Sequence, residues 1–355
     1  MMDWLAKMIH LPEHFLFSHE GPGGGVIQGT ASEATLVTLL AARNKTLATN
    51  PTTGSIDCPE TLGRLVAYCS EQAHSSVQRA SLLGAVRMRS LPTDSDLSLR
   101  GETLATAIRE DRENGFVPFF VVATLGTTST CSFDNLEELG QVCVREGIWL
   151  HVDAAYAGSS FVCPEFRRFM RGIELADSFN MNPHKWLLVN FDCSTLWIKD
   201  ASHVVDAFNV NPVYLRHEMQ GKVPDYRHWQ IPLGRRFRSL KMWFVFRTFG
   251  EKGLQAHIRK HVNLAKEFEQ KVLSDSRFEL FCPVELGLVC FRLIGSNEMN
   301  EQLNQLINAN KKIHVTPTHV HDRFVLRFAV CARSTEKADI EFAWNEIRAH
   351  ANSLL

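Results

Sequence analysis

FFVVATLGTTSTCSFDNLEELGQVCVREGIWLHV, residues 119–152, indicates the fold class of this chain. It begins with the apolar run 119–123 and ends with the apolar run 149–152, and both predict strands. Between them, four apolar residues recur at helical spacing: Leu136, Leu139, Val142 and Cys143. A strand, a helix and a second strand in this order predict an α/β fold with a largely parallel sheet flanked by helices.

Polar residues follow four predicted strands, and such folds bind ligands where parallel strands end. The strands are 65–68, 119–123, 149–152 and 178–181, with 193–198 as a further candidate. The residues after them are His74, Thr128, Asp153, Ala155, Asn182, His184 and Lys185. Taken singly, Asp153 could be a helix cap, Thr128 a turn residue and His74 a residue at a helix start. Four such strand ends at one edge favour a ligand site.

Lys185 lies in the pentapeptide Asn182-Pro183-His184-Lys185-Trp186, between two apolar runs. We expect its amine to be desolvated there, which lowers the pKa of a lysine and makes it nucleophilic. A lysine that forms a Schiff base needs this property. The pentapeptide alone is equally compatible with a turn lysine whose side chain reaches the surface.

Gly29-Thr30-Ala31-Ser32 precedes a helical pattern over residues 33–43. Small hydroxyl residues at this position usually cap the helix. The free N–H groups of a helix start also bind phosphate. The stretch is neither a Gly-x-Gly-x-x-Gly motif nor a Walker loop, so a phosphate site and a plain cap both remain open.

The composition excludes several other classes of protein. The chain has 38 basic and 39 acidic residues, a balance that favours neither nucleic-acid nor membrane partners. Its nine cysteines contain no Cys-x-x-Cys pair, which argues against a disulfide framework or a zinc ribbon and favours a reducing compartment, the cytoplasm. We see no signal peptide and no run of transmembrane length. His257 and His261 lack a third ligand, so we interpret them as surface residues and predict no metal.

The last third of the chain has a different pattern. It predicts helices over 241–249, 254–273 and 336–354 and strands over 288–293 and 324–328, without β-α-β spacing. We therefore expect a large domain of residues 1–240 and a smaller α+β domain of residues 241–355. The segment 209–226 has little periodicity and contains Tyr214, either as a functional loop residue or as a surface anchor.

Pyridoxal 5′-phosphate requires this combination of residues. Its aldehyde would form a Schiff base with Lys185, and Asp153 would keep a proton on its ring nitrogen. His74 would stack on the ring. The stretch Thr30-Ala31-Ser32 would bind the phosphate.

The chain also closely resembles the pyridoxal-phosphate decarboxylases that act on aromatic L-amino acids and on histidine. The resemblance runs from end to end and is carried by residues 28–34, 73–76, 123–128, 151–158, 182–186 and 229–243. It implies the type I aminotransferase-like fold, a cofactor bound covalently to Lys185, and a homodimer with active sites at its interface. Segments before residue 1 in the family embrace the partner subunit, so the resemblance also implies an N-terminal truncation.

The same resemblance implies a role for each matching residue. Lys185, His74, Asp153 and Tyr214 would be catalytic, with Tyr214 returning a proton to the substrate carbon. The residues that would line the cofactor are Thr30, Ala31, Ser32, His74, Thr128, Asp153, Ala155, Asn182, His184 and Lys185. Gly234 matches the aromatic-amino-acid enzymes, whereas the histidine enzymes carry serine, and His74 with Tyr214 argues against the related aldehyde synthases. We therefore expect dopa or 5-hydroxytryptophan as substrate.

Three alternatives remain beside this reading. The substrate could be histidine. The chain could bind the cofactor without turnover and act as an interaction partner, because the segment implied to be missing supplies part of the pocket. A nucleotide-binding Rossmann protein is a further alternative, although the glycine fingerprint of that class is absent.

Overall fold

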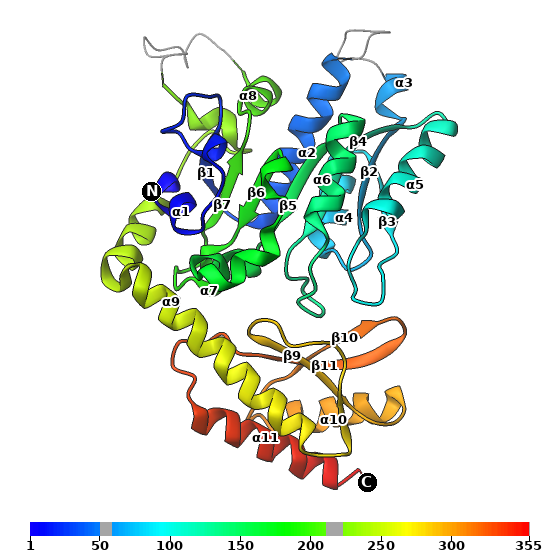
Figure 1. Cartoon of the computed structure of the whole chain (residues 1–355), viewed down its shortest axis with the longest axis vertical. Coiled ribbons are helices and arrows are strands. Elements are labelled where there is room, and N and C mark those ends of the chain that lie inside the picture. The colour runs from blue at the N-terminus through cyan, green and yellow to red at the C-terminus, as the bar shows by residue number, and fades with distance from the viewer. Residues whose placement is uncertain (50–58, 211–222, 355) are drawn as a thin grey trace. The chain divides into compact units, whose positions relative to one another are not determined.

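The computed structural model describes residues 1–49, 59–210 and 223–354. The chain forms two compact units (Figure 1). The first contains Met1–Gly126 and Phe133–Glu251, and the second contains Thr127–Ser132 and Lys252–Leu355. The second unit therefore includes a short segment from the middle of the sequence of the first.

A seven-stranded sheet forms the centre of the first unit. In spatial order its strands are β1 (Gly24–Gln28), β7 (Ser194–Ile198), β6 (Ser178–Met181), β5 (Trp149–Asp153), β4 (Val117–Thr124), β2 (Leu65–Ser70) and β3 (Arg87–Leu91). All pairs from β6 to β3 are parallel, whereas β7 is antiparallel to β6 and to β1. The predicted α/β class with a largely parallel sheet is confirmed.

Two strands of this sheet were not predicted. The glycines of β1 resemble a loop, but they are needed because a Cβ at Gly24 would lie 2.4 Å from the ring of Phe17 and one at Gly25 would lie 2.7 Å from Trp197. Strand β3 is largely exposed and begins with Arg87, so it contains no apolar run. Both strands lie at the edges of the sheet.

The helices of the first unit are α1 (Met2–Met8), α2 (Ala31–Ala48), α3 (Pro59–Leu62), α4 (Ser75–Leu83), α5 (Gly101–Glu113), α6 (Leu136–Glu146), α7 (Pro183–Trp186) and α8 (Ser202–Phe208). Helix α1 ends at Met8, shortly before His10, which adopts a left-handed backbone with φ 60°. Helix α6 ends in the same way, because Gly147 has φ 66°.

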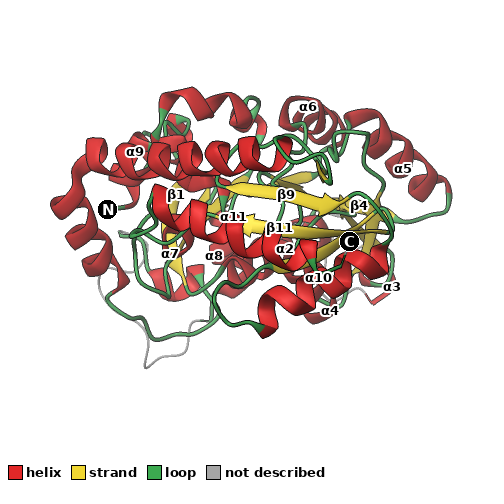
Figure 2. Cartoon of the chain, turned by 90° about the horizontal axis from the view of Figure 1, so that it is seen from below, coloured by secondary structure: helices red, strands yellow, loops and turns green. Residues whose placement is uncertain are grey.

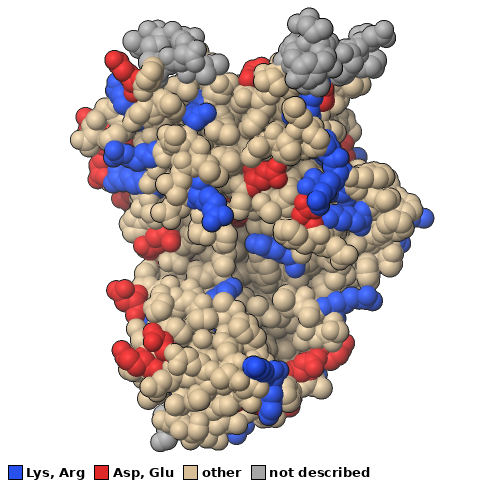
Figure 3. Space-filling view, turned by 180° about the vertical axis from the view of Figure 1, so that it is seen from behind, with Lys and Arg blue, Asp and Glu red and all other residues tan. Residues whose placement is uncertain are grey.

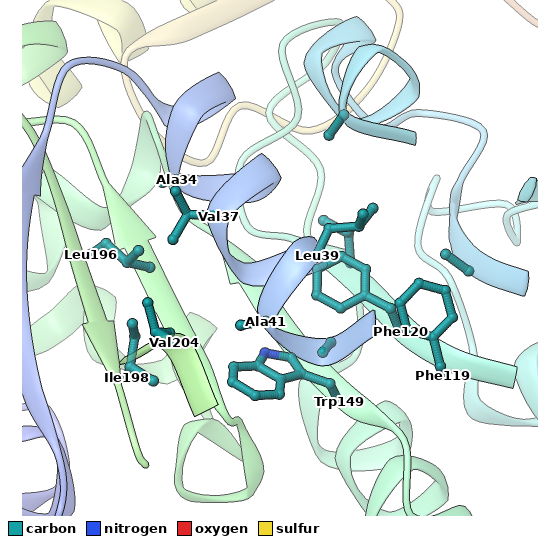
Figure 4. Close-up of a cluster of buried hydrophobic side chains, with 14 of the residues drawn as sticks. Ala34, Val37, Leu39, Ala41, Phe119, Phe120, Trp149, Leu196, Ile198 and Val204 are labelled. Atoms are coloured by element: carbon teal, nitrogen blue, oxygen red, sulfur yellow. The ribbon is translucent and has the colours of Figure 1, made fainter. Parts of the chain in front are cut away.

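Helix α2 is fixed along its length by the core of the first unit. Figure 4 shows its apolar residues against strands β4, β5 and β7 and helix α8: Ala34, Val37, Leu39, Ala41, Phe119, Phe120, Trp149, Leu196, Ile198 and Val204. Each large side chain buried in this way stabilises the fold by roughly 1.5–3 kcal/mol. This packing fixes the position of the N-terminus of α2 relative to the sheet.

The second unit contains a four-stranded antiparallel sheet in the order β10 (Thr316–Val320), β11 (Arg323–Ala329), β9 (Leu288–Leu293) and β8 (Phe278–Leu280). Helices α10 (Asn297–Ala309) and α11 (Lys337–Asn352) and the C-terminal part of α9 (Arg238–Leu273) share its core (Figure 2). Phe268 of α9 contacts Phe291 of β9 at 5.4 Å and Trp344 of α11 at 5.7 Å between ring centroids. This arrangement confirms the predicted α+β character.

Two expectations about α9 need correction. The structure divides the chain after Glu251 rather than after residue 240, because α9 is interrupted at Gly250, whose φ of 59° and ψ of 178° are not helical. His257 and His261 are not surface residues: they are 9% and 0% exposed. They lie one turn apart, so they share one face of the helix, and this face is buried.

Within the described residues, no helix has the length and apolar character needed to cross a membrane. The same residues contain no group of three or more histidine, cysteine or acidic side chains arranged to hold a metal ion. Acidic and basic side chains are interspersed on the face shown in Figure 3.

Candidate active site

Six strands of the first unit end at the same edge of the sheet, and β3, which is parallel to β2, is one of them. Strands β2, β4, β5 and β6 are parallel, and β1 runs with β6 because both are antiparallel to β7. The residues at or after these strand ends include Thr30, Ala31, Ser32, His74, Asp153, Ala155, Asn182, His184 and Lys185. The structure therefore brings most of the predicted site residues to one edge, as the strand–helix alternation indicated.

Asp153 is the last residue of β5, and only 4% of it is exposed. Side chains alternate along a strand, so Asp153 shares the face of Trp149, which packs with α2. Its Oδ1 accepts a hydrogen bond from the backbone N–H of Ala155 at 3.0 Å. A buried carboxylate is stable when it is paired with a cation and hydrogen-bonded, so Asp153 is suited to a cationic group of a ligand.

Buried polar atoms without a partner surround Asp153. Thr124 lies beside it on β4, Asn180 lies beside it on β6, and His151 precedes it on the same face. Within the described protein, Thr124 Oγ1, His151 Nε2, Asn180 Oδ1 and Asn182 Oδ1 have no hydrogen-bond partner. Since buried polar atoms are nearly always hydrogen-bonded, this group fits a ligand that carries several hydrogen-bonding atoms.

Lys185 is exposed, so the prediction that it is desolvated between buried runs is wrong. It lies in the single turn of α7, where Pro183 and Trp186 are buried and Lys185 occupies the open side. Desolvation is the main cause that lowers the pKa of His74 and His184, and the charge of Lys185 lowers both further. Lys185 is therefore accessible to a ligand at this edge, beside two histidines.

His74 caps the N-terminus of α4: its Nδ1 accepts a hydrogen bond from the backbone N–H of Ser76 at 3.1 Å. Partial burial is the largest influence on the pKa of His74 and lowers it; Lys185 lowers it further and Asp153 raises it. The balance favours a neutral imidazole with its proton on Nε2. The buried Asp153 and the exposed Lys185 thus both influence the pKa of His74, in opposite directions.

Asn182 and His184 surround the turn that holds Lys185. Asn182 is 2% exposed, its N–H donates to the carbonyl oxygen of Ala155 at 3.1 Å, and its own carbonyl oxygen accepts from Lys185 N–H at 2.9 Å. His184 Nδ1 accepts from the N–H of Cys193 at 2.8 Å. Burial, followed by Lys185, lowers the pKa of His184 to about 4. A neutral His184 therefore has Nε2–H as a free donor.

The start of α2 is capped, and its free N–H groups suit an anion. Thr30 Oγ1 accepts from Glu33 N–H at 3.2 Å, and the Glu33 carboxylate accepts from Gly29 N–H at 2.9 Å, so Thr30 is a capping residue. The first N–H groups of a helix have no partner within it, and the helix dipole favours an anion there. Ala31 and Ser32 are therefore the candidates for binding phosphate.

Three predicted residues remain: Thr128, Gly234 and Tyr214. Thr128 is exposed on the segment Thr127–Ser132, which belongs to the second unit. Gly234 lies in an exposed turn, where an added Cβ would meet no described heavy atom within 4 Å. Tyr214 lies outside the described residues.

Sequence reasoning missed three polar neighbours of Asp153: Thr124, His151 and Asn180. The run HVD already contained a signal for His151, because residues two apart on a strand share a face. The signals for Thr124 and Asn180 depend on the register between strands, in which Thr124 pairs with Asp153 and Asp153 pairs with Asn180. That register depends on how strands distant in the sequence pack together, so the sequence pattern does not reveal it.

The buried histidines predict a loss of stability in acid. Burial lowers the pKa of His151 to about 4, as it does for His184, whereas an unfolded histidine titrates near 6.5. Between pH 4 and pH 6.5 the unfolded chain therefore binds more protons at these histidines than the folded chain does. The free energy of unfolding should fall as pH drops from 6.5 towards 4, by up to about 1.4 kcal/mol per pH unit for each histidine.

Urea denaturation of the wild type and of His151→Phe across this range measures the effect. Burial raises the pKa of Asp134 to about 7, which acts in the opposite direction within the same window. The comparison of variants removes that contribution, since Asp134 is present in both. We expect a shallower pH slope for His151→Phe, and equal slopes would show that His151 does not contribute.

Comparison with known proteins adds independent evidence. Residues 1–294 match the family model described as the pyridoxal-dependent decarboxylase conserved domain. Aromatic-L-amino-acid decarboxylase of Rattus norvegicus is 60% identical over 361 residues, an alignment that covers 100% of this chain and 75% of the rat protein.

Two solved structures share the fold over almost the whole chain. Oryza sativa TDC with PLP and tryptamine has a TM-score of 0.95 and 41% identity, and covers 99% of this chain and 74% of its own. Catharanthus roseus tryptophan decarboxylase in complex with L-tryptophan has a TM-score of 0.92 and 41% identity, and covers 100% of this chain and 75% of its own.

Proposed function

The chain belongs to the pyridoxal-dependent decarboxylase family, and we propose that it converts an aromatic L-amino acid, dopa or 5-hydroxytryptophan, into the amine and carbon dioxide. Pyridoxal 5′-phosphate is its cofactor. The observation that carries the proposal for the site is that parallel strands bring buried Asp153, His74 and exposed Lys185 to one edge of the sheet. These are the three side chains that the cofactor's aldehyde, ring nitrogen and ring face require.

When bound, the cofactor supplies an aldehyde for the amino group of the substrate and a ring that withdraws the electrons left by carbon dioxide. Lys185 would hold the cofactor covalently and would transfer a proton as substrate enters and product leaves. Asp153 keeps the ring nitrogen protonated, and its burial strengthens that interaction. His74 packs against the ring as a neutral imidazole.

The residues that would hold the phosphate are Ala31 and Ser32, through the first N–H groups of α2, together with Asn182 and the Nε2–H of His184. Asn182 is buried and its amide nitrogen can donate a hydrogen bond, and the lowered pKa of His184 leaves a neutral ring that donates from Nε2; both support this assignment. By the resemblance, Tyr214 would return the proton to the substrate carbon, and Thr128 and Ala155 would be cofactor residues. The roles of Tyr214 and Thr128 follow from the resemblance alone.

Carbon dioxide release tests the proposed reaction. We expect the protein, saturated with cofactor, to release carbon dioxide from dopa or 5-hydroxytryptophan faster than from histidine. Faster release from histidine would identify a histidine decarboxylase. Cofactor absorbance without release from any of the three substrates would indicate a binding-only protein.

Gly234→Ser tests the substrate assignment. We expect kcat/KM for histidine to rise relative to that for dopa, by about tenfold for one hydrogen bond gained. Gly234 is exposed and its surroundings are open, so serine fits without disturbing the fold. An unchanged ratio of the two kcat/KM values would remove Gly234 from substrate selection.

The partner we propose is a second copy of this chain. Six large apolar side chains of the first unit are at least 40% exposed within one short segment, the 231–244 apolar surface: Ile231, Leu233, Phe237, Leu240, Trp243 and Phe244. Exposed apolar clusters of this kind commonly mark interfaces. Sedimentation should give twice the 40.2 kDa chain mass. Phe237→Asp should lower that mass, whereas Phe342→Asp, a similar change on α11, should not.

A further inference from the structure

An ion pair lies beside the start of α2. Arg238, the first residue of α9, donates from Nη2 and Nε to Asp192 Oδ2 at 2.7 and 3.1 Å. A Cβ built on Gly29 would lie 3.4 Å from Asp192 Oδ2 and 3.7 Å from Arg238 Nη2. The pair therefore contacts the backbone immediately before the helix start that we assign to phosphate.

Three basic side chains surround the carboxylate of Asp192: Arg236, Arg238 and Lys241. Arg236 and Lys241 each lie 3.6 Å from its Oδ1, and Lys241 Nζ also donates to the carbonyl oxygen of Asn190 at 3.0 Å. Arg238, as the largest influence, lowers the pKa of Asp192 to about 2. The side chains of Asp192 and Arg238 are 16% and 15% exposed, so solvent screens this bond only partly.

The residues after Asp192 connect the pair to both sides of the proposed phosphate site. The N–H of Cys193 donates to His184 Nδ1 at 2.8 Å and so fixes the imidazole ring. Ser194, the next residue, pairs with Gln28 at the end of β1, which leads into Gly29 and α2. One short segment thus holds His184 on one side and the start of α2 on the other.

We propose that Asp192, held by Arg238, is a positioning residue of the phosphate site: it fixes His184 and the N-terminus of α2 relative to each other. Neither side chain is required to touch the cofactor for this role. The inference rests on the proposed function, because it takes the start of α2 as the phosphate site. An ion pair that only fastened the beginning of α9 would stabilise the fold without distinguishing a phosphorylated ligand from an unphosphorylated one.

Two ligands that differ only in the phosphate separate these roles. Cofactor-free protein is titrated with pyridoxal 5′-phosphate and with pyridoxal, and Kd is measured for each. Asp192→Asn should raise the Kd for pyridoxal 5′-phosphate about tenfold, the effect of one charge-assisted hydrogen bond. The Kd for pyridoxal should stay unchanged. Asp192→Glu, which keeps the charge, should restore part of the affinity for the phosphorylated ligand.

Glu146→Gln is a matched control. Glu146 also binds two arginines, Arg112 and Arg145, and its side chain is 18% exposed, but it lies at the end of α6, and we assign it no role in the site. Glu146→Gln should leave the Kd for pyridoxal 5′-phosphate and the Kd for pyridoxal unchanged. Thermal unfolding of the cofactor-free proteins shows whether each variant folds. If Asp192→Asn does not fold, Arg238→Gln tests the same ion pair.

The outcomes separate this inference from the proposed function. If the wild type does not prefer pyridoxal 5′-phosphate over pyridoxal, the phosphate site itself is misassigned. If the wild type shows the preference and Asp192→Asn or Arg238→Gln keeps it in full, the positioning role is refuted. An equal loss of affinity for both ligands would also refute it, because it would show a general rather than a phosphate-specific effect.

Discussion

Lys185→Ala is expected to lower carbon dioxide release from dopa by at least about a thousandfold, in line with the loss of a group that transfers protons in the reaction. The variant lacks the side-chain amine that would hold the cofactor and that the substrate amine would displace. The fold should persist, because Lys185 is exposed and its backbone N–H still reaches the carbonyl oxygen of Asn182. Steady-state assay with saturating cofactor measures the loss.

Two further variants separate the amine from the charge. Lys185→Arg keeps the positive charge near His74 and His184 but cannot act as the nucleophile, so it should be as inactive as Lys185→Ala. Lys199→Ala removes another exposed lysine, one that follows the end of β7, and should retain activity. An active Lys185→Arg would show that charge alone matters, and an active Lys185→Ala would remove Lys185 from the reaction.

Asp153→Asn should lower kcat by roughly 10²- to 10³-fold, the loss typical of removing one preorganised electrostatic group. The amide has nearly the same shape and can still accept the hydrogen bond from Ala155, but it carries no negative charge to keep a ring nitrogen protonated. Because Asp153 is buried, no water replaces that charge at full strength. Asp153→Glu, which keeps the charge on a longer side chain, should lose less.

Asp177→Asn is the control for removing a partly buried carboxylate beside the same sheet. Asp177 lies at the opposite edge, just before β6, where its Oδ2 accepts from Leu150 N–H at 2.8 Å. Its loss should reduce the free energy of unfolding but leave kcat close to that of the wild type. Similar kcat values for Asp153→Asn and Asp177→Asn would show that position 153 has no special role.

The edge of the sheet was predictable because it depends on local patterns. Apolar runs separated by a helical repeat fix the parallel direction of strands, and parallel strands end together. His74, Asp153 and Asn182 then follow the strands to one edge without knowledge of the packing. The same logic predicted the second unit from two alternating strands and a helix, because these patterns also extend over only a few residues.

Other features could not be predicted because they depend on contacts between distant parts of the chain. Lys185 follows an apolar run, but whether a residue in a single helical turn is buried depends on what packs against that turn. Strand β1 is rich in glycine because the Phe17 ring and Trp197 approach its backbone closely. The sequence separated a helix over 241–249 from one over 254–273 but assigned both to the small domain, whereas the structure places the first with the large unit.

The most direct measurement is borohydride reduction of the cofactor-loaded protein, followed by proteolysis and mass spectrometry of the peptides. Reduction turns a lysine-bound cofactor into a stable pyridoxyl adduct. We predict one adduct, on the peptide that contains Lys185, and none in Lys185→Ala. An adduct on a different lysine, or no adduct on the wild type, would contradict the assignment of the active site.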